Sequence, residues 1–504
     1  MKYDSLFALL RRRGVLWPTA EIYGGAAGLY DYGPLGAALK RRVEDAWTRW
    51  FVGLSDDFHL IEPAEILPEP VVRASGHLEN FTDPEVTCGQ CHTAFRADTV
   101  LEATHPAGVD GLTAAEIGRV LEDERPRCPK CGAQALTVAR PFNLMFGVDL
   151  GAVGGERGYL RPETAQSSFL AFSRMWDVGR RALPLGIAVI GRAYRNEIAP
   201  RQVLFRMRAF TQAELQVFLD PDAWSAPGPL ADDPLPIVRA DRRIAGDATT
   251  VPTRPSALIA AGMPAFYAYF LAHMFRFFVE VLGVPAASVR LWEKSDQERA
   301  FYNRIQFDVE VAVESLGGFR EIGAVHYRGD YDLTRHGAGS GRDLSIALEG
   351  GRRLVPHVLE LTFGVDRAIW ALADLGLVEE DGRTVWRLPP YLAPVGVAVL
   401  PLMKKEHGPT AQRIGDACRA AGMAAMFDES GSIGRRYARA DEAGTPFAVT
   451  VDGATLGPEG PEMGTVTLRH RDTRAQERVP IAGLVDRLAP SLRPPTAPRH
   501  PPGD

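Results

Sequence analysis

The stretch FRMRAFTQAELQVFL, residues 205–219, alternates apolar and polar side chains with the two-residue period of a β-strand. One face of the predicted strand is almost wholly apolar and carries Phe205, Met207, Ala209, Ala213, Leu215, Val217 and Leu219. The other face carries Arg206, Arg208, Phe210, Gln212, Glu214 and Gln216. A buried strand with so polar a face is costly unless something charged lies on it, so this face is either solvent-exposed sheet surface or the floor of a binding site.

The residues before this strand favour the binding site. A second strand-like run, GIAVIGRAYR at residues 186–195, leads into Asn196, Glu197 and a proline-containing loop. The two runs predict an antiparallel hairpin with a charged loop. Arginines suit phosphate oxygens, an aromatic ring such as Phe210 can stack on a flat base, and Gln212 with Glu214 can hold a small polar ligand.

Several blocks of the chain resemble one enzyme family. Residues 191–218 resemble the second signature motif of class II aminoacyl-tRNA synthetases in its glycyl form, residues 28–51 the first motif and residues 357–372 the third. RASGHLENFTDP at 73–84 and YLRPETAQ at 159–166 are similar to blocks of the glycyl enzymes. The resemblance implies a ligase that activates glycine with ATP to glycyl-adenylate and transfers glycine to the 3′ end of its tRNA.

The expected fold class is α+β. We expect an antiparallel-sheet catalytic domain of the class II type from residues 1–85 and 139–385, interrupted at 86–138 by a cysteine-containing, zinc-knuckle-like insertion. From Pro394 onward, strand-like and helix-like patterns alternate, which predicts a separate α/β domain at 390–490. By resemblance this is an anticodon-binding domain. The proline-rich end, residues 491–504, is expected to be disordered.

By resemblance, the catalytic residues are two arginines that bind ATP. Arg195 would contact the α-phosphate of ATP and the amino-acid carboxylate, and Arg367 would contact the γ-phosphate. Phe210 would stack on adenine, Glu197 would meet its edge and Arg206 would add a phosphate contact. The other residues expected around ATP are Asn196, Phe205, Glu321, Ile322 and Gly364. Glu321, in a predicted turn at 320–323, is expected near the phosphates and Mg²⁺, or else as a solvated loop carboxylate.

Glycine has no side chain to grip, so its site must hold the amino and carboxylate groups and exclude anything larger. Carboxylates crowding the α-carbon would do both. By resemblance, Glu163 and Glu360 hold the ammonium, Arg328 orients glycine, and Thr362 closes the pocket where the family usually has a serine. The other residues expected around glycine are Arg73, Phe210, Gln212 and Glu214.

Four of the five cysteines form two Cys-x-x-Cys pairs, which are Cys88 with Cys91 and Cys128 with Cys131. Each pair places two thiolates on a tight turn, and four sulfurs complete a closed tetrahedral metal site with no open position for catalysis. The interval between the pairs is longer than the roughly 15–20 residues usual in zinc ribbons. Structural Zn²⁺ is expected, while a site that has lost its metal and a redox role stay open. Cys418 is expected in the core of the C-terminal domain.

Charge and hydropathy exclude some classes of protein. A net charge of −6 argues against holding nucleic acid through a global positive field. Contacts with tRNA must therefore be local, and the C-terminal residues considered for them are Lys404, Lys405, Arg435, Arg436 and Arg439. We find no apolar run near the roughly 20 residues that span a bilayer, and no signal-peptide cleavage pattern. The expectation is a cytoplasmic protein without a membrane partner, and the first motif implies a homodimer.

Two other functions stay open. A non-catalytic nucleic-acid-binding relative on the same scaffold would be expected to lack the phosphate arginines, whereas Arg195, Arg206 and Arg367 are all present. A synthetase for threonine, proline or histidine is the second, and the RPETAQ block with the paired glutamates weighs against it.

Overall fold

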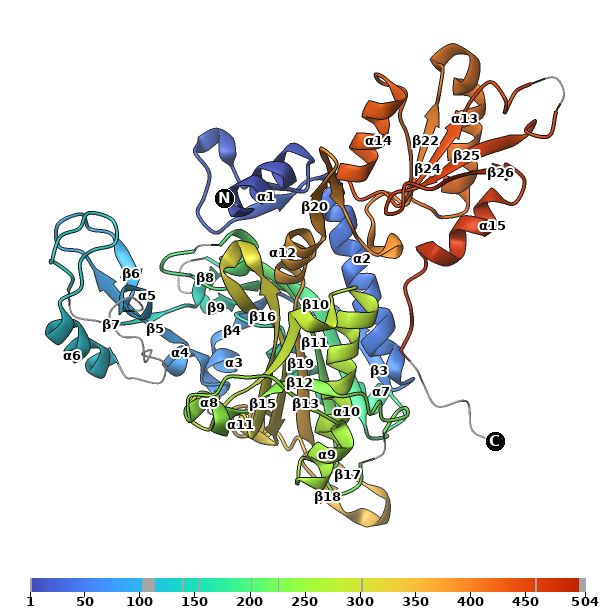
Figure 1. Ribbon diagram of the computed structural model, residues 1–504. Helices are drawn as coiled ribbons and strands as arrows, with labels where there is room; N and C mark the ends of the chain where they lie inside the picture. The colour runs from blue at the N-terminus through green and yellow to red at the C-terminus, as the bar shows by residue number, and fades with distance from the viewer. Residues whose placement is uncertain are drawn as a thin grey trace.

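The computed structural model describes residues 2–101, 114–137, 140–152, 155–200, 202–224, 226–300, 302–457 and 460–497. Figure 1 shows a central sheet flanked by helices, with a smaller lobe on one side and a separate C-terminal domain on the other. Within these residues, no helix combines the length and the apolar character needed to cross a membrane.

The central sheet is mainly antiparallel, as the sequence predicts. Over the described residues it has nine strands in the order β13-β12-β14-β15-β16-β19-β11-β10-β3. Only the pairs β10–β3 and β12–β14 are parallel. The strands are β3 (Phe58–Ile61), β10 (Leu185–Tyr194), β11 (Ala209–Leu219), β12 (Leu235–Val238), β13 (Val251–Thr253), β14 (Val289–Glu293), β15 (Ile305–Val313), β16 (Gly318–Gly329) and β19 (His357–Gly364).

Helices cover the two faces of this sheet unequally. One face packs on α2 (Pro34–Phe51), on α10 (Ala265–Arg276) and on α12 (Val365–Gly376), and the apolar side chains of β11 lie in this core. On the other face, α7 (Ala165–Val178) packs on Ile187, Phe218 and Val358. Because α7 covers only the far end of β10, β11 and β19, the end near Phe210 is left for polar residues.

The predicted hairpin forms, but its second strand begins later than expected. β10 and β11 pair from Leu185 with Phe218 to Tyr194 with Ala209. Val203–Phe205 is a 3₁₀ turn instead of strand, and Gln202 before it has a left-handed φ of 60°. On the N-terminal side of Ala209, the chain has no partner in β10. There the Arg208 backbone N–H donates to the Gly28 carbonyl at 2.8 Å. The prediction of a strand from residue 205 is therefore wrong for residues 205–208.

The cysteine-containing lobe is built on a three-stranded sheet in the order β6-β5-β7. Its strands are β5 (Thr82–Thr87), β6 (Ala94–Arg96) and β7 (Arg140–Asn143), and its helices are α5 (Ala97–Leu101) and α6 (Ala114–Glu124). The sheet thus extends beyond residues 86–138 at both ends. It joins the catalytic domain through β4 (Ile66–Pro68), β8 (Phe146–Leu150), β9 (Glu156–Leu160), α3 (Glu69–Ala74) and α4 (His77–Asn80).

The C-terminal domain is α/β, as predicted, with a sheet in the order β23-β22-β24-β25-β26. Its elements are β22 (Val397–Pro401), α13 (Lys404–Ala420), β23 (Ala425–Phe427), α14 (Ile433–Glu442), β24 (Phe447–Val451), β25 (Thr465–His470), β26 (Gln476–Pro480) and α15 (Leu484–Leu488). Cys418 lies in its core, as expected. In the segment expected to be disordered, Leu492 packs against this core and Ala497 lies in the main core, while residues 498–504 are outside the described residues.

Shorter elements complete the described chain. They are α1 (Lys2–Arg12), β1 (Leu16–Pro18), η1 (Glu21–Tyr23), β2 (Tyr30–Tyr32), η2 (Val52–Leu54), η3 (Val203–Phe205), α8 (Ala240–Ile244), α9 (Pro255–Ala260), η4 (Phe277–Val281), η5 (Ala286–Ser288), η6 (Glu314–Leu316), α11 (Tyr331–Ser340), β17 (Ile346–Ala347), η7 (Glu349–Gly351), β18 (Arg353–Leu354), β20 (Leu377–Glu380), β21 (Arg383–Trp386), η8 (Pro390–Leu392) and η9 (Ala489–Leu492).

Candidate active site

A cavity of about 280 Å³ opens on the polar face of the sheet, over β11, β16 and β19. Most residues predicted to bind ATP or glycine line it together: Glu163, Arg195, Glu197, Phe205, Arg206, Phe210, Gln212, Glu214, Glu321, Ile322, Glu360, Thr362, Gly364 and Arg367. The polar face of β11 is therefore not open sheet surface, since Gln212, Glu214 and Gln216 are all buried.

Strand register gathers the acidic residues at one end of this cavity. Glu214 on β11 lies opposite Thr362 on β19, and Gln216 lies opposite Glu360. Because directly opposed residues of neighbouring strands point to the same side, these side chains share one face. The Gln216 amide donates to Glu360 Oε2 at 2.8 Å, and the Thr362 hydroxyl donates to Glu360 Oε1 at 3.1 Å. The Glu360 carboxylate is thereby fixed in orientation.

Glu163 reaches the same end from the segment before α7. Gln166 Nε2 donates to Glu163 Oε1 at 2.8 Å, and His77 Nε2 lies 3.6 Å from Glu163 Oε2. Burial opposes its ionisation, but His77, Arg328 and the bond from Gln166 outweigh burial and hold the pKa of Glu163 below its usual value. Glu163 is therefore a fixed negative charge.

Two neighbours fix the orientation of the His77 ring. The Ser75 hydroxyl donates to the Val72 carbonyl at 3.1 Å and lies 2.7 Å from His77 Nδ1. His77 Nε2 is thereby turned towards the Glu163 carboxylate.

His326 stands in the same relation to Glu360. Its Nε2 lies 3.6 Å from Glu360 Oε1, and Asn303 Nδ2 donates to its Nδ1 at 2.9 Å. The Asn303 amide also donates to Gln306 Oε1 at 3.0 Å, which fixes its orientation. Burial lowers the pKa of His326. A neutral ring with the proton on Nε2 thus faces Glu360.

Glu214 completes the acidic end as a neutral group. Its Oε2 accepts a hydrogen bond from the Thr164 hydroxyl at 2.6 Å. Burial raises the pKa of Glu214 well above its usual range, and the negative charges of Glu360 and Glu163 raise it further. Three carboxyl groups meet here, and one of them keeps its proton.

Arg328 lies behind the acidic end and does not line the cavity. Its Nε and Nη2 each donate to Asp332 at 2.7 Å, its Nη1 donates to Glu360 Oε2 at 3.2 Å, and its Cζ lies 4.0 Å from the centre of the Tyr302 ring. The guanidinium is fully buried. Arg328 therefore contacts the acidic end of the cavity through Glu360.

Arginines line the other end of the cavity. Arg195 Nε donates to the Pro162 carbonyl at 3.2 Å, and its Cζ lies 5.2 Å from the centre of the Phe210 ring. Arg367 Nε donates to the Phe205 carbonyl at 3.3 Å, and its Nη1 donates to the Glu321 carbonyl at 3.1 Å. These bonds leave other N–H groups of each guanidinium for a ligand.

Between the acidic end and the arginines lies a buried polar atom that has no hydrogen-bond partner among the described residues. Gln212 lines the cavity midway along β11, and its Oε1 is this atom.

Gly364 stands where β19 passes into α12, and a Cβ there would lie 3.3 Å from Arg367 Cδ. The glycine leaves room for the arginine side chain.

The matches to known proteins agree with this site. The chain is 37% identical to the glycine–tRNA ligase of Methanothermobacter thermautotrophicus over 97% of its own length and 99% of that protein. It is 38% identical to the corresponding ligase of Aeropyrum pernix over 96% of each chain. This chain belongs to the glycine–tRNA ligase family. The family model described as an anticodon binding domain matches residues 396–490.

The solved structures show the same fold outside this family. A prolyl-tRNA synthetase from Cryptosporidium parvum, solved with halofuginone and AMPPNP, aligns with a TM-score of 0.59 at 14% identity. The alignment covers 97% of this chain and 75% of that one. The class II synthetase fold predicted from the three motifs is confirmed.

Besides Arg328, two predicted site residues of this glycine–tRNA ligase family member lie outside the cavity, and a third lines it from a different element. Arg73 does not line the cavity, because its guanidinium turns to Glu69 one helical turn earlier on the surface of α3. Asn196 is absent from the lining, and its N–H donates to the Leu144 carbonyl at 2.8 Å. Glu321 does line the cavity, but from strand β16 and not from a turn, so that prediction of local structure is wrong.

Seven lining residues were not predicted: Arg96, Leu204, Met207, Thr211, Tyr302, His326 and Asp366. His326 lies two residues before Arg328 on one strand, so strand alternation could have revealed it. Asp366 sits in the third motif between two predicted residues, Gly364 and Arg367, and its carboxylate accepts bonds from the Tyr32 hydroxyl and the Thr211 N–H. Arg96 and Tyr302 carry no local signal in the sequence.

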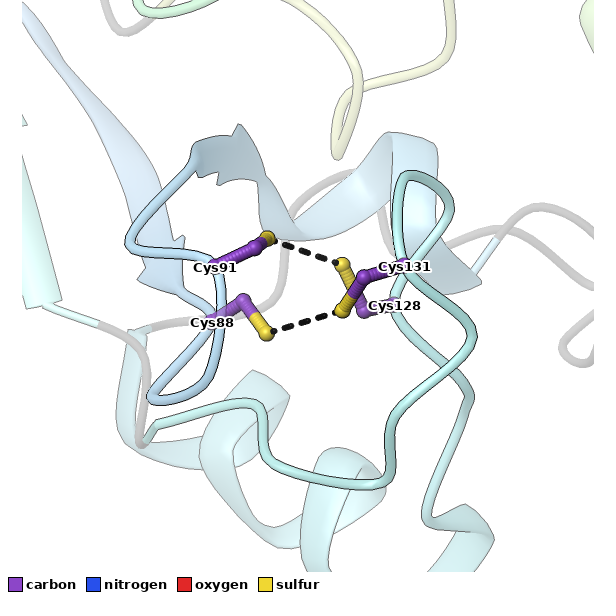
Figure 2. A group of neighbouring side chains, drawn as sticks. All are labelled: Cys88, Cys91, Cys128 and Cys131. Carbon is purple, nitrogen blue, oxygen red and sulfur yellow. Dashed lines mark hydrogen bonds between the residues drawn. The ribbon is translucent and has the colours of Figure 1, made fainter.

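The four cysteines of the lobe converge as predicted (Figure 2). Their sulfur atoms all lie within 4.8 Å of one another, and the Cys88–Cys131 and Cys91–Cys128 distances are both 3.7 Å. A tetrahedral ion with metal–sulfur bonds of about 2.3 Å separates its sulfurs by about 3.8 Å. The donor set fits a closed four-thiolate metal site.

The basic residues considered for tRNA contact separate into three groups. Arg436 is buried and donates to the Pro401 and Gly431 carbonyls, so it supports the domain from within, and that prediction is wrong. Lys404 pairs with Glu429 and Arg439 pairs with Asp428. Lys405 and Arg435 are exposed.

Proposed function

We propose that this chain joins glycine to its tRNA in two steps, first forming glycyl-adenylate from glycine and ATP. The observation that supports this most directly is the division of one cavity into an acidic buried end and an arginine-lined end. A substrate pair with a cationic amine at one extreme and a polyphosphate at the other complements that arrangement.

Glycine would bind with its ammonium between Glu163 and Glu360. The orientation of both carboxylates is fixed by side-chain contacts, so little entropy is lost when the ammonium arrives. Glu214 and Thr362 line the same part of the cavity and would exclude a larger α-substituent. Selection for glycine then rests on exclusion, because the substrate has no side chain to contact.

Adenylate formation requires the glycine carboxylate to meet the α-phosphate in line with the departing pyrophosphate. Arg195, at the basic end, would hold both reacting groups, while Arg206 and Arg367 would neutralise the phosphates. Phe210 would stack on adenine, and the partnerless Gln212 oxygen would accept from a substrate N–H or O–H. Burial raises the pKa of Glu321, but Arg367 and Lys294 outweigh it and lower the pKa, so a carboxylate is available for Mg²⁺, which would neutralise charge on the phosphates.

In the second step a ribose hydroxyl of the tRNA 3′ end would attack the glycyl carbonyl and release AMP. The C-terminal domain would bind the anticodon, with the exposed Lys405 and Arg435 as phosphate contacts. We further infer that α2, in the first motif, takes part in a homodimer, that the four cysteines hold structural Zn²⁺, and that the enzyme works in the cytoplasm. A non-catalytic nucleic-acid-binding role is disfavoured because the three arginines all face the cavity.

The deciding experiment is amino-acid-dependent exchange of pyrophosphate into ATP, with glycine, alanine, serine, threonine and proline compared. We expect exchange with glycine alone, and loss of it in Glu163→Gln. Glu69→Gln, which removes a surface carboxylate paired with Arg73, is the control and should be unchanged. Folded protein that supports no exchange with any amino acid would overturn the proposal.

A further inference from the structure

The cysteine-containing lobe contributes one side chain to the catalytic cavity. Arg96, the last residue of β6, lines the cavity with Arg195, Arg206 and Arg367. Its Nη1 donates to Asp83 Oδ2 at 2.5 Å, and its side chain is only 18% exposed. One edge of the guanidinium is thus anchored within the lobe while the residue borders the cavity.

The base of the lobe is packed against the catalytic hairpin. The Asn196 N–H donates to the Leu144 carbonyl at 2.8 Å, and the Leu144 N–H donates to the Phe81 carbonyl at 3.0 Å. Arg195 Cζ also lies 5.2 Å from the centre of the Phe81 ring. The chain that enters and leaves the lobe therefore shares contacts with the loop that carries Arg195.

The cysteine cluster closes the hairpin that presents Arg96. β5 and β6 pair with Glu85 opposite Arg96 and Thr87 opposite Ala94, and Cys88 and Cys91 occupy the turn between them. Both turn cysteines meet the second pair at 3.7 Å. A slip of one residue in this short pairing would turn Arg96 to the other face of the sheet. The contacts between the two cysteine pairs oppose such a slip.

The chemistry of the site indicates what Arg96 binds. Arg96 borders the cavity together with three other arginines, Arg195, Arg206 and Arg367. The planar guanidinium matches phosphate oxygens, and a phosphate can be shared by several arginines. We propose that Arg96 is a phosphate-binding residue of the active site and that the four-cysteine cluster holds it in place. This inference rests on the proposed function, and the phosphate belongs either to ATP or to the tRNA 3′ end.

Arg140 provides a matched control. It lies on β7 of the same small sheet and pairs with Glu85 of β5 at 2.9 Å, as Arg96 pairs with Asp83. Arg140 does not line the cavity, and its side chain is 72% exposed. Replacing either arginine by glutamine removes one ion pair with a β5 carboxylate, so loss of lobe stability affects both variants and loss of phosphate contact only one.

The two sources of phosphate are separated by assay. Pyrophosphate exchange needs no tRNA, so an ATP contact predicts that Arg96→Gln raises the KM for ATP about tenfold or more, with the same shift in ATP binding by calorimetry. A tRNA contact predicts normal exchange and a similar rise in the KM for tRNA during aminoacylation. Arg140→Gln should change each constant less than about twofold. Equal behaviour of the two variants in every assay would overturn the inference while leaving glycine activation intact. Wild-type protein without exchange would instead refute the proposed function.

The role of the cluster is tested by Cys131→Ser combined with metal analysis. We expect bound metal to be lost and the Arg96→Gln defect to be reproduced, with the double variant no worse than either single one, because both changes remove the same contact. Arg96→Lys, which keeps the charge and leaves the cysteines intact, should retain part of the binding. If the two defects multiply in the double variant, the cluster does not act through Arg96, and that half of the inference fails.

Discussion

The two ends of the catalytic cavity hold their charges in different ways. At the acidic end, Glu163 and Glu360 accept hydrogen bonds from the side chains of Gln166, Gln216 and Thr362. At the basic end, Arg195 and Arg367 donate mainly to backbone carbonyl groups, and Arg367 also lies 3.2 Å from the Glu321 carboxylate.

Because of this difference, substitutions at the two ends should have different effects. A side-chain network fixes the position of a small ligand and changes when any one member changes. Backbone carbonyls tether one edge of a guanidinium, and its other N–H groups can follow a phosphate as charge develops on it. We therefore expect the acidic end to decide which amino acid binds, and the basic end to decide how fast it reacts.

The largest effect is expected from Arg195→Gln. Removing a cation that faces developing charge on the phosphate should lower kcat for pyrophosphate exchange by about 10²- to 10³-fold. The KM for glycine should change far less. Steady-state exchange kinetics measure both constants, and Arg180→Gln, which breaks a surface ion pair with Asp57, is the control. A change in the KM for glycine without a change in kcat would contradict the proposed division of roles between the two ends.

His77→Gln should produce the next effect. Glutamine can donate to Glu163 but carries no charge, so the contribution of His77 to lowering the pKa of Glu163 is lost, and the KM for glycine should rise about tenfold with the KM for ATP unchanged. His326→Gln is the matched comparison, because a neutral donor already faces Glu360 and glutamine preserves it. Similar defects in the two variants would show that His77 supports Glu163 no more than His326 supports Glu360.

Glu214→Gln should change stability in a pH-dependent way. The pKa of Glu214 is raised in the folded protein, so the stability that its neutral form supports is complete below its usual value of 4.5 and is lost as pH rises towards the folded-state pKa. Glutamine resembles the neutral acid and does not ionise. The difference in free energy of unfolding should therefore shift in favour of the variant between pH 4.5 and neutral pH, as denaturant titrations at several pH values would show. A constant difference would mean that Glu214 is ionised.

Thr362→Ser should have the smallest effect. The hydroxyl bond to Glu360 is kept, so the KM for glycine should stay within about twofold, while loss of one methyl group should raise activation of alanine by several-fold. Thr362→Val, which keeps the methyl position and removes the hydroxyl, should raise the KM for glycine instead. Discrimination against alanine that is unchanged in the serine variant would show that the methyl group does not border the substrate.

The sequence of β11 was sufficient to predict which of its side chains face a ligand, because a strand alternates its faces whatever surrounds it. Its starting point was not predictable. Residues 205–208 alternate just as well, yet they lie outside the sheet. The pairing with β10 ends at Tyr194, and the Arg208 N–H donates to the Gly28 carbonyl instead of to a strand. Pairing partners that are distant in the chain decided that boundary.

Local pattern by itself determined the antiparallel hairpin, the two cysteine pairs and the C-terminal α/β domain, since each depends on residues close together in the chain. Tertiary structure alone decided that Arg73 turns to the surface, that Arg328 lies behind Glu360, and that Arg96 of the lobe reaches the cavity. The physical reason is that register and packing between distant segments set which side chains converge, and residue type and spacing do not encode that directly.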